Sequence, residues 1–139
     1  LDGDNLRHGL NADLGFSMAD RSENLRRLAH VAAILADSGQ VVLVPAISPL
    51  AEHRELARTV ADEAGVEFFE VFCDTPLDDC ERRDPKGLYA KARSGEITHF
   101  TGIDSPYQRP KNPDLRLTPE RSPDELAAAV IEMLESRGQ

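Results

Sequence analysis

The sequence is poor in several residue types, and each shortage excludes a class of protein. It has no tryptophan and only 5% aromatic residues, so a hydrophobic core must be built mainly from aliphatic side chains. Its two cysteines, Cys73 and Cys80, are too few for a disulfide framework and have no nearby histidine pair that would indicate a zinc site. No apolar run reaches the length of a transmembrane helix and no signal peptide is present, which favours a cytoplasmic protein.

Positive charge is also scarce. The 139 residues include 16 Lys and Arg against 25 Asp and Glu, which gives a net charge of -9. Such an acidic chain is not expected to bind nucleic acid or a membrane surface, because both are themselves negatively charged. An anionic ligand would have to be bound by a local cluster of basic side chains.

Alternating helical and strand patterns predict a single α/β domain with a parallel sheet. The apolar run at residues 41–44 is typical of a strand buried on both faces. Ser17, with Asp20 three residues later, predicts the start of a helix, and Ser122-Pro123 predicts another. The expected helices cover residues 18–38, 49–65, 75–83 (capped by Thr75), 88–93 and a last segment from residue 122; the expected strands cover residues 41–44, 68–73 and 115–117.

Residues 84–107, DPKGLYAKARSGEITHFTGIDSPY, form the most informative segment and are called the lid below. Lys86, Lys91 and Arg93 make it locally basic, its glycines supply hinges, and Phe100 and other aromatic residues supply flat faces. A mobile segment of this kind suits an anionic ligand that carries a ring, such as a nucleotide. A solvated surface loop is the alternative, and it is favoured for a basic run taken alone.

A second polar segment, LDGDNLRHGLN, opens the chain and is followed by SMADRSEN. It reads as a strand end that turns into a polar loop. Its carboxylates, arginine and asparagine could hold a sugar hydroxyl and a magnesium-bound phosphate. Taken residue by residue, Asp2 and Asp4 fit an ordinary Asp-Gly turn equally well, and Phe16 fits a core position.

Four segments together carry a family resemblance. LDGDNLRHGLN, the Ile-Ser-Pro triplet at residues 47–49, DPKGLYAKAR and FTGIDSPY resemble the adenylylsulfate (APS) kinases in order and spacing, over nearly the whole chain. The resemblance implies the three-layer α/β fold of the P-loop kinases (nucleoside-triphosphate hydrolase-like), in one domain over residues 1–139. It also implies an enzyme that phosphorylates the 3′-hydroxyl of adenylylsulfate with MgATP, giving 3′-phosphoadenylylsulfate (PAPS) for sulfate assimilation.

The resemblance further implies which residues form the site. Asp4, Ser48 and Lys86 are the expected catalytic residues. Asp4 would orient the ribose 3′-hydroxyl, Lys86 would contact the phosphosulfate, and Ser48 would bind substrate without acting as a required nucleophile. Phe16 and Phe100 would stack on the two faces of the adenine. The other expected substrate-binding residues are Asn5, Leu6, Arg7, Arg21, Ser22, Glu23, Asn24, Ile47 and His99.

The expected ATP site is less complete. Arg82 and Arg83 are candidates, although basic residues that end a helix also complement its dipole. Asp2 is the candidate magnesium ligand, directly or through water. The phosphate-binding motif G-x-x-x-x-G-K-[ST] is absent, because the chain contains no Gly-Lys dipeptide. The resemblance places that motif, the first strand and the first helix upstream of Leu1, so we expect residues 1–139 alone to be N-terminally incomplete and inactive.

Partners and alternatives also follow from the resemblance. Such domains commonly form homodimers and are often fused to, or associated with, ATP sulfurylase. A hypothesis of a different class is a catalytically silent kinase-like domain that binds PAPS or APS and regulates an attached sulfurylase. The enzyme is favoured by the presence of Asp4, Arg7, Ser48, Lys86 and Phe100, and the lid sequence disfavours another small-molecule P-loop kinase.

Overall fold

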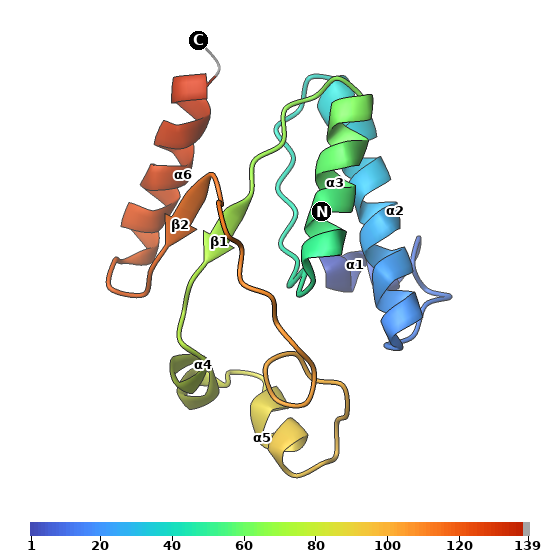
Figure 1. Ribbon diagram of the computed structural model, residues 1–139, viewed down its shortest axis with the longest axis vertical. Helices are drawn as coiled ribbons and strands as arrows, with labels where there is room; N and C mark the ends of the chain where they lie inside the picture. Colours follow the sequence, from blue (N-terminus) through green and yellow to red (C-terminus); the bar gives the residue numbers. More distant parts are fainter. Residues whose placement is uncertain (138–139) are drawn as a thin grey trace. The chain divides into compact units, whose positions relative to one another are not determined.

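The computed structural model describes residues 1–137, and the chain divides into two compact units (Figure 1). Unit 1 comprises Leu1–Phe68 together with Ser105–Arg109. Unit 2 comprises Phe69–Asp104 and the chain from Pro110 onward. Each unit has its own secondary structure and its own candidate functional residues, and the two are described in turn.

Two long helices that lie side by side form the body of unit 1, α2 (Met18–Asp37) and α3 (Ala51–Glu63) (Figure 1). The predicted start of α2 is confirmed, because the Ser17 side chain accepts a hydrogen bond of 3.1 Å from the Asp20 N–H. His53 is buried on α3, and its Nε2 lies 2.9 Å from the Ser22 hydroxyl of α2. The buried apolar residues between these helices are Leu28, Ala33, Val60 and Ala61.

A short helix, α1 (Gly3–Arg7), replaces the polar loop that the sequence predicted at the start of the chain. Asp2 is its N-cap, and Asp2 Oδ1 accepts a 2.8 Å hydrogen bond from the Asp4 N–H. This bond satisfies one of the N–H groups that the first turn of a helix leaves without a partner. An Asp before a short polar run was therefore a capping signal as well as a turn signal.

The predicted strand at residues 41–44 is wrong. The segment is extended, but no strand among residues 1–137 forms a ladder with it. Three of its four side chains are instead exposed, with Val41 at 74% and Leu43 at 65%, and Val42 is half-buried. The Leu1 ammonium donates a 2.6 Å hydrogen bond to the Leu43 carbonyl, so the start of the chain lies beside this segment. An apolar run becomes a strand only where a second strand supplies hydrogen bonds, and sequence periodicity does not show that partner.

Unit 2 contains a two-stranded parallel sheet of β1 (Val71–Cys73) and β2 (Leu115–Leu117), with Val71 opposite Leu115. The predicted parallel pairing type is confirmed, although β1 is three residues long rather than the six expected from residues 68–73. Phe72 is buried in the centre of β1. Beyond the strand, the Asp74 N–H donates to the Leu117 carbonyl at 2.7 Å, which extends the pairing by one bond.

Three helices complete unit 2: α4 (Leu77–Arg83), α5 (Leu88–Arg93) and α6 (Pro123–Arg137). The last begins at the predicted proline and contacts β2, while α5 is the helical turn predicted within the lid. The predicted cap of α4 is wrong, because its N-cap is Pro76 with no side-chain hydrogen bond, and not Thr75. Proline fixes its own φ near the required value and so begins the helix without a capping side chain.

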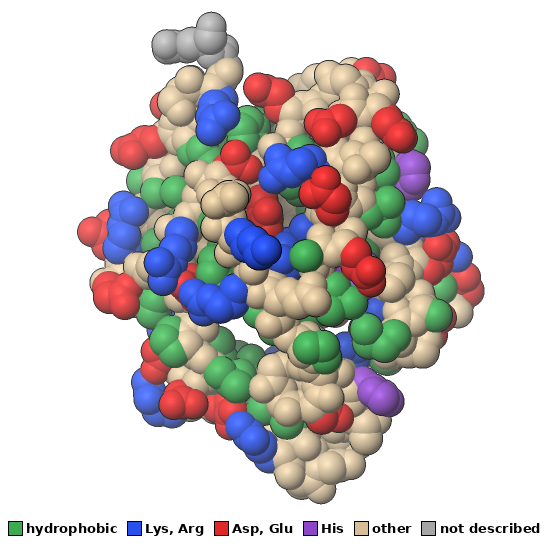
Figure 2. Space-filling view, in the orientation of Figure 1, with side chains coloured by type: hydrophobic (Ala, Val, Ile, Leu, Met, Phe, Trp, Pro, Cys, Tyr) green, Lys and Arg blue, Asp and Glu red, His purple; other side chains and the backbone are tan. Residues whose placement is uncertain are grey.

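The surface carries charge of both signs, with acidic and basic side chains interspersed on the face drawn in Figure 2. Within the described part of the chain, no helix combines the length and apolar character needed to span a bilayer.

Candidate functional site

In unit 1 the predicted substrate residues begin on α1. The side chains of Asp4 and Asn5 are exposed on its first turn, whereas Leu6 and Arg7 are half-buried. Because the capping bond to Asp2 is made by the backbone N–H of Asp4, that bond does not depend on the Asp4 carboxylate. Helix α1 therefore holds an exposed carboxylate on a fixed backbone.

Arg7 connects α1 to the loop that carries Phe16. Its Nη1 donates to the Leu14 and Gly15 carbonyls, both at 3.1 Å, and its guanidinium carbon lies 4.3 Å from the centre of the Phe16 ring. The Phe16 side chain is nevertheless 67% exposed. One face of the ring is thus covered by a cation, and the ring still presents enough surface to stack on a flat ligand.

The first turns of α2 carry Arg21, Ser22, Glu23 and Asn24. Arg21 Nε donates to the Phe16 carbonyl at 3.0 Å, and Ser22 bonds His53. Arg26 and Arg27 lower the pKa of the Glu23 carboxyl to about 2 through hydrogen bonds to it. Of these four expected substrate contacts, Glu23 is already engaged by two arginines.

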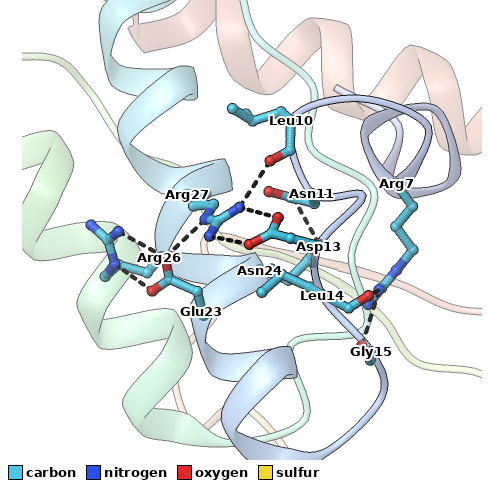
Figure 3. Close-up of polar contacts among 10 residues, drawn as sticks. All are labelled: Arg7, Leu10, Asn11, Asp13, Leu14, Gly15, Glu23, Asn24, Arg26 and Arg27. Atoms are coloured by element: carbon cyan, nitrogen blue, oxygen red, sulfur yellow. Dashed lines mark hydrogen bonds and ion pairs between the residues drawn. The ribbon is translucent and has the colours of Figure 1, made fainter.

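Arg27 of α2 forms hydrogen bonds with Leu10 and Asp13, in the loop that precedes Phe16 (Figure 3). Its Nη1 donates to the Leu10 carbonyl at 2.9 Å and to Asp13 Oδ1 at 2.7 Å, and its Nη2 donates to Asp13 Oδ2 at 2.9 Å. Its Nε donates to Glu23 at 2.8 Å. Sequence reasoning missed this residue, although an acidic residue four positions before an arginine on a helix is a recognised pairing signal.

Asn11 belongs to the same loop, and its side chain is fully buried. Its Nδ2 donates a 2.8 Å hydrogen bond to Asn24 Oδ1, so the amide of a predicted substrate residue is oriented from inside the unit (Figure 3). The Asn24 oxygen therefore already accepts one hydrogen bond. The NH₂ group of Asn24 suits an acceptor such as a phosphate, sulfate or ribose oxygen.

We expect Asn11→Ala to lower the free energy of unfolding by about 1–3 kcal/mol, because it removes a buried amide and leaves the oxygen of Asn24 without its partner. Asn112→Ala, at an exposed position of unit 2, is the matched control and should leave stability unchanged. Thermal unfolding of the full-length variants measures both effects. Equal melting temperatures for the Asn11 variant and the wild type would show that the buried bond contributes nothing.

Ile47 and Ser48 follow the extended segment of unit 1. The Ile47 side chain is 69% exposed, and Ser48 is half-buried. Ser48 has a φ of 40°, a backbone conformation that is uncommon for residues other than glycine. This conformation could not be predicted from the sequence, since a serine before a proline is typical of an ordinary turn.

In unit 2 the start of the lid is ordered by Asp84. Its two carboxylate oxygens accept hydrogen bonds from the Tyr89 and Ala90 N–H groups at 3.1 and 3.0 Å, which caps α5. Partial burial raises the pKa of the Asp84 carboxyl, but the backbone N–H bonds outweigh this and lower the pKa below its ordinary value. Lys86 lies in the turn between this carboxylate and α5, with its side chain exposed.

The other lid cations are engaged in ion pairs. Lys91 Nζ lies 3.6 Å from Glu96, and Arg93 Nη2 lies 2.6 Å from Glu81. Their charges are therefore balanced locally.

Phe100 is held at the far end of the lid. Its ring meets Tyr89 edge-on, with 5.0 Å between ring centres and 69° between planes. Asp104 accepts hydrogen bonds from the N–H groups of His99 and Phe100, and His99 has a φ of 58°. Burial raises the pKa of Asp104, but these N–H bonds outweigh that effect and lower it. The turn thus fixes the direction in which Phe100 leaves the backbone.

Arg82 and Arg83 line a cavity of about 300 Å³ within unit 2, together with Asp79, Pro119 and Glu120. Arg82 also bonds Asp79. The cavity brings two guanidinium groups next to a proline ring, a combination that could contact both the phosphates and the base of a nucleotide.

The predicted residues are thus divided between the two units, and each unit is ordered internally. Asp2, Asp4, Arg7, Phe16, Arg21, Asn24 and Ser48 lie in unit 1, whereas Arg82, Arg83, Lys86, His99 and Phe100 lie in unit 2. The predicted stacking of one base between Phe16 and Phe100 concerns both units and stays a prediction.

A magnesium ion would find one suitable protein group in unit 1. Asp2 is exposed and uses Oδ1 in the α1 cap, so its carboxylate fits an ion that is held mainly by phosphate oxygens and water. Among residues 1–137 no three side chains of His, Cys, Asp or Glu gather into a metal cluster.

Comparison with known proteins gives a consistent result. Residues 1–118 match the family described as adenylylsulphate kinase. The chain is 83% identical over 136 residues to the bifunctional enzyme CysN/CysC of Mycobacterium tuberculosis, covering 98% of this chain but only 22% of that protein. It is 52% identical over 139 residues to a probable adenylyl-sulfate kinase of Bacillus subtilis, covering 99% of this chain and 69% of that one.

A solved structure is similar as well. The Mycobacterium tuberculosis APS kinase CysC in complex with AMPPNP and APS superimposes with a TM-score of 0.95 at 83% sequence identity, covering 97% of this chain and 78% of that chain.

Proposed function

Because this chain belongs to the adenylylsulphate kinase family and has the α/β fold of its P-loop kinases, we propose that it transfers the γ-phosphoryl group of ATP to the 3′-hydroxyl of adenylylsulfate. The product would be PAPS. The family match over residues 1–118 carries this proposal. It is supported by the exposed Asp4 carboxylate and the Phe16 ring, which Arg7 joins in one unit.

Unit 1 would bind the acceptor substrate. Phe16 stacks on the adenine, and such stacking typically contributes about 1–3 kcal/mol. Arg21 and the NH₂ group of Asn24 face the same side of α2, because they lie three residues apart, and they bind anionic or ribose oxygens. Asp4 accepts a hydrogen bond from the 3′-hydroxyl and takes up its proton as the new bond forms. The further contacts in unit 1 would be Asn5, Leu6, Arg7, Ser22, Glu23, Ile47 and Ser48.

The lid would supply charge and a second aromatic face. Lys86 contacts the phosphosulfate, and Phe100 and His99 contact the nucleotide from the turn that Asp104 holds. Since the phosphosulfate carries negative charge, a lysine placed beside it binds and orients the acceptor substrate electrostatically. Water exclusion by a closed lid strengthens that interaction.

ATP would lie at the cavity of unit 2, where Arg82 and Arg83 contact it. Magnesium, when bound, neutralises the β- and γ-phosphates and orients them for in-line transfer. Asp2 would contact that ion through water. Catalysis then consists of positioning and charge neutralisation, with no covalent enzyme intermediate.

The whole protein would be larger than this chain. The chain spans 22% of the length of the bifunctional Mycobacterium tuberculosis relative. We propose that an ATP sulfurylase component is attached to it or associated with it, that the kinase domain forms a homodimer, and that the protein acts in the cytoplasm, where ATP is supplied.

The direct test is substrate choice. With the full-length protein and MgATP, release of ADP should respond to adenylylsulfate and much less to AMP or adenosine, which lack the sulfate that Lys86 is proposed to contact. Equal turnover with adenosine or with an unrelated alcohol such as shikimate would overturn the substrate assignment. Binding of PAPS without any turnover would indicate a silent regulatory domain.

A further inference from the structure

The backbone at Ser48 is in a strained conformation that other contacts must stabilise. Its φ of 40° lies in the left-handed region, where a residue with a Cβ atom is strained. Such residues persist when surrounding contacts hold them, and they are frequent at ligand-binding positions. In unit 1 the contacts that could hold this turn come from α3 and from the segment Ser105–Arg109.

Arg54 of α3 donates hydrogen bonds to the turn at Ser48 and to the segment Ser105–Arg109. Its Nη1 donates to the Ser48 carbonyl and its Nη2 donates to the Gln108 carbonyl, each at 2.8 Å. One planar guanidinium therefore joins two backbone segments that are far apart in the sequence. Hydrogen bonds from a charged donor are stronger than neutral ones, and the fork of a guanidinium also fixes direction.

Gln108 makes two further hydrogen bonds to the residues that follow Ser48. Its N–H donates to the Pro49 carbonyl at 2.8 Å, and its Oε1 accepts the Ala51 N–H at 2.7 Å. Leu50, the N-cap of α3, makes no side-chain capping bond. Gln108 therefore performs the capping role that Leu50 cannot, and it does so directly after the last residue of the lid, Tyr107.

We propose that Arg54 and Gln108 are positioning residues that hold Ser48 in its ligand-binding conformation and tie the end of the lid to that turn. This inference rests on the proposed function for its ligand, but the bonds themselves are independent of it. Because both residues act through backbone groups of residues 48–51, their replacement should change adenylylsulfate binding and leave ATP binding unchanged.

The test uses variants of the full-length protein. Gln108→Met removes the acceptor of the Ala51 N–H while keeping side-chain length, and Gln108→Glu keeps an oxygen acceptor at the same place. Gln40→Met, at an exposed glutamine of unit 1, is the matched control. We expect Gln108→Met to raise the KM for adenylylsulfate about three- to tenfold, which corresponds to losing one net hydrogen bond. The KM for ATP should stay constant, and Gln108→Glu should remain within about twofold of the wild type.

A second readout does not depend on turnover. Amide exchange at Ala51, followed by NMR, should accelerate in Gln108→Met and in Arg54→Ala but not in Gln40→Met. Wild-type protein that turns over no adenylylsulfate would refute the proposed function, whereas unchanged exchange at Ala51 in Gln108→Met would refute the positioning role. Equal increases in both KM values would also refute it, as would a Glu variant as impaired as the Met variant.

Discussion

Asp4→Asn is expected to lower the kcat of the full-length protein by about 100- to 10,000-fold, the range that general acid–base groups contribute. Asparagine has nearly the same size but cannot take up the proton of the 3′-hydroxyl. The fold should tolerate the change, since the bond that caps α1 is donated by the backbone N–H of residue 4 to Asp2. The KM for ATP and the melting temperature should therefore stay near the wild-type values.

Asp62→Asn is the matched control for this prediction. Asp62 is an exposed carboxylate on α3, and its replacement makes the same change of charge away from the candidate site. Steady-state kinetics with both substrates separates the two variants. An Asp4 variant with normal kcat would remove Asp4 from the proton transfer and leave it, at most, a binding role.

Lys86→Ala should reduce kcat/KM for adenylylsulfate by about 10- to 100-fold, the loss typical of removing one hydrogen bond between charged groups. Lys86 is exposed in a turn between Asp84 and α5, so its side chain is not needed for packing. The decisive comparison is Lys91→Ala, which removes the same charge from the lid at a position that already pairs with Glu96.

We expect Lys91→Ala to remain within about threefold of the wild type, as for the loss of an exposed ion pair. If the two lysine variants lose the same amount of activity, the lid acts through its overall charge and Lys86 has no specific contact.

Local signals in the sequence predicted several elements correctly. Ser17 and Asp20 fixed the start of α2, and Pro123 fixed the start of α6, because capping and a preset φ act within one helical turn. A parallel sheet was also predicted, and β1 and β2 do pair in parallel, although hydrogen bonds extend over only three residues of each strand. The run at residues 41–44 had the composition of a strand, but composition does not supply a neighbouring strand.

In the candidate site too, features with a local pattern were predicted, whereas features that depend on distant contacts were not. The candidate roles of Asp4, Asn24, Ser48 and Lys86 came from the resemblance to the APS kinases. The residues that position Asn24 and the turn at Ser48 were not predicted, because they act through contacts between residues far apart in the sequence. Asn11 appears in a polar run yet is fully buried, and Gln108 appears in an irregular stretch yet caps α3. A buried amide or a distant cap has no local pattern, so only the folded chain reveals it.

The position of the transferred phosphate is the most direct test of the proposed phosphorylation of adenylylsulfate at its 3′-hydroxyl. The full-length protein would be incubated with adenylylsulfate and ATP labelled in its γ-phosphate, and the labelled nucleotide would be isolated and its phosphate position determined by NMR. We expect label on the 3′-oxygen of a nucleotide that keeps its sulfate. Label on the 2′-oxygen, on inorganic phosphate alone, or on a nucleotide without sulfate would contradict it.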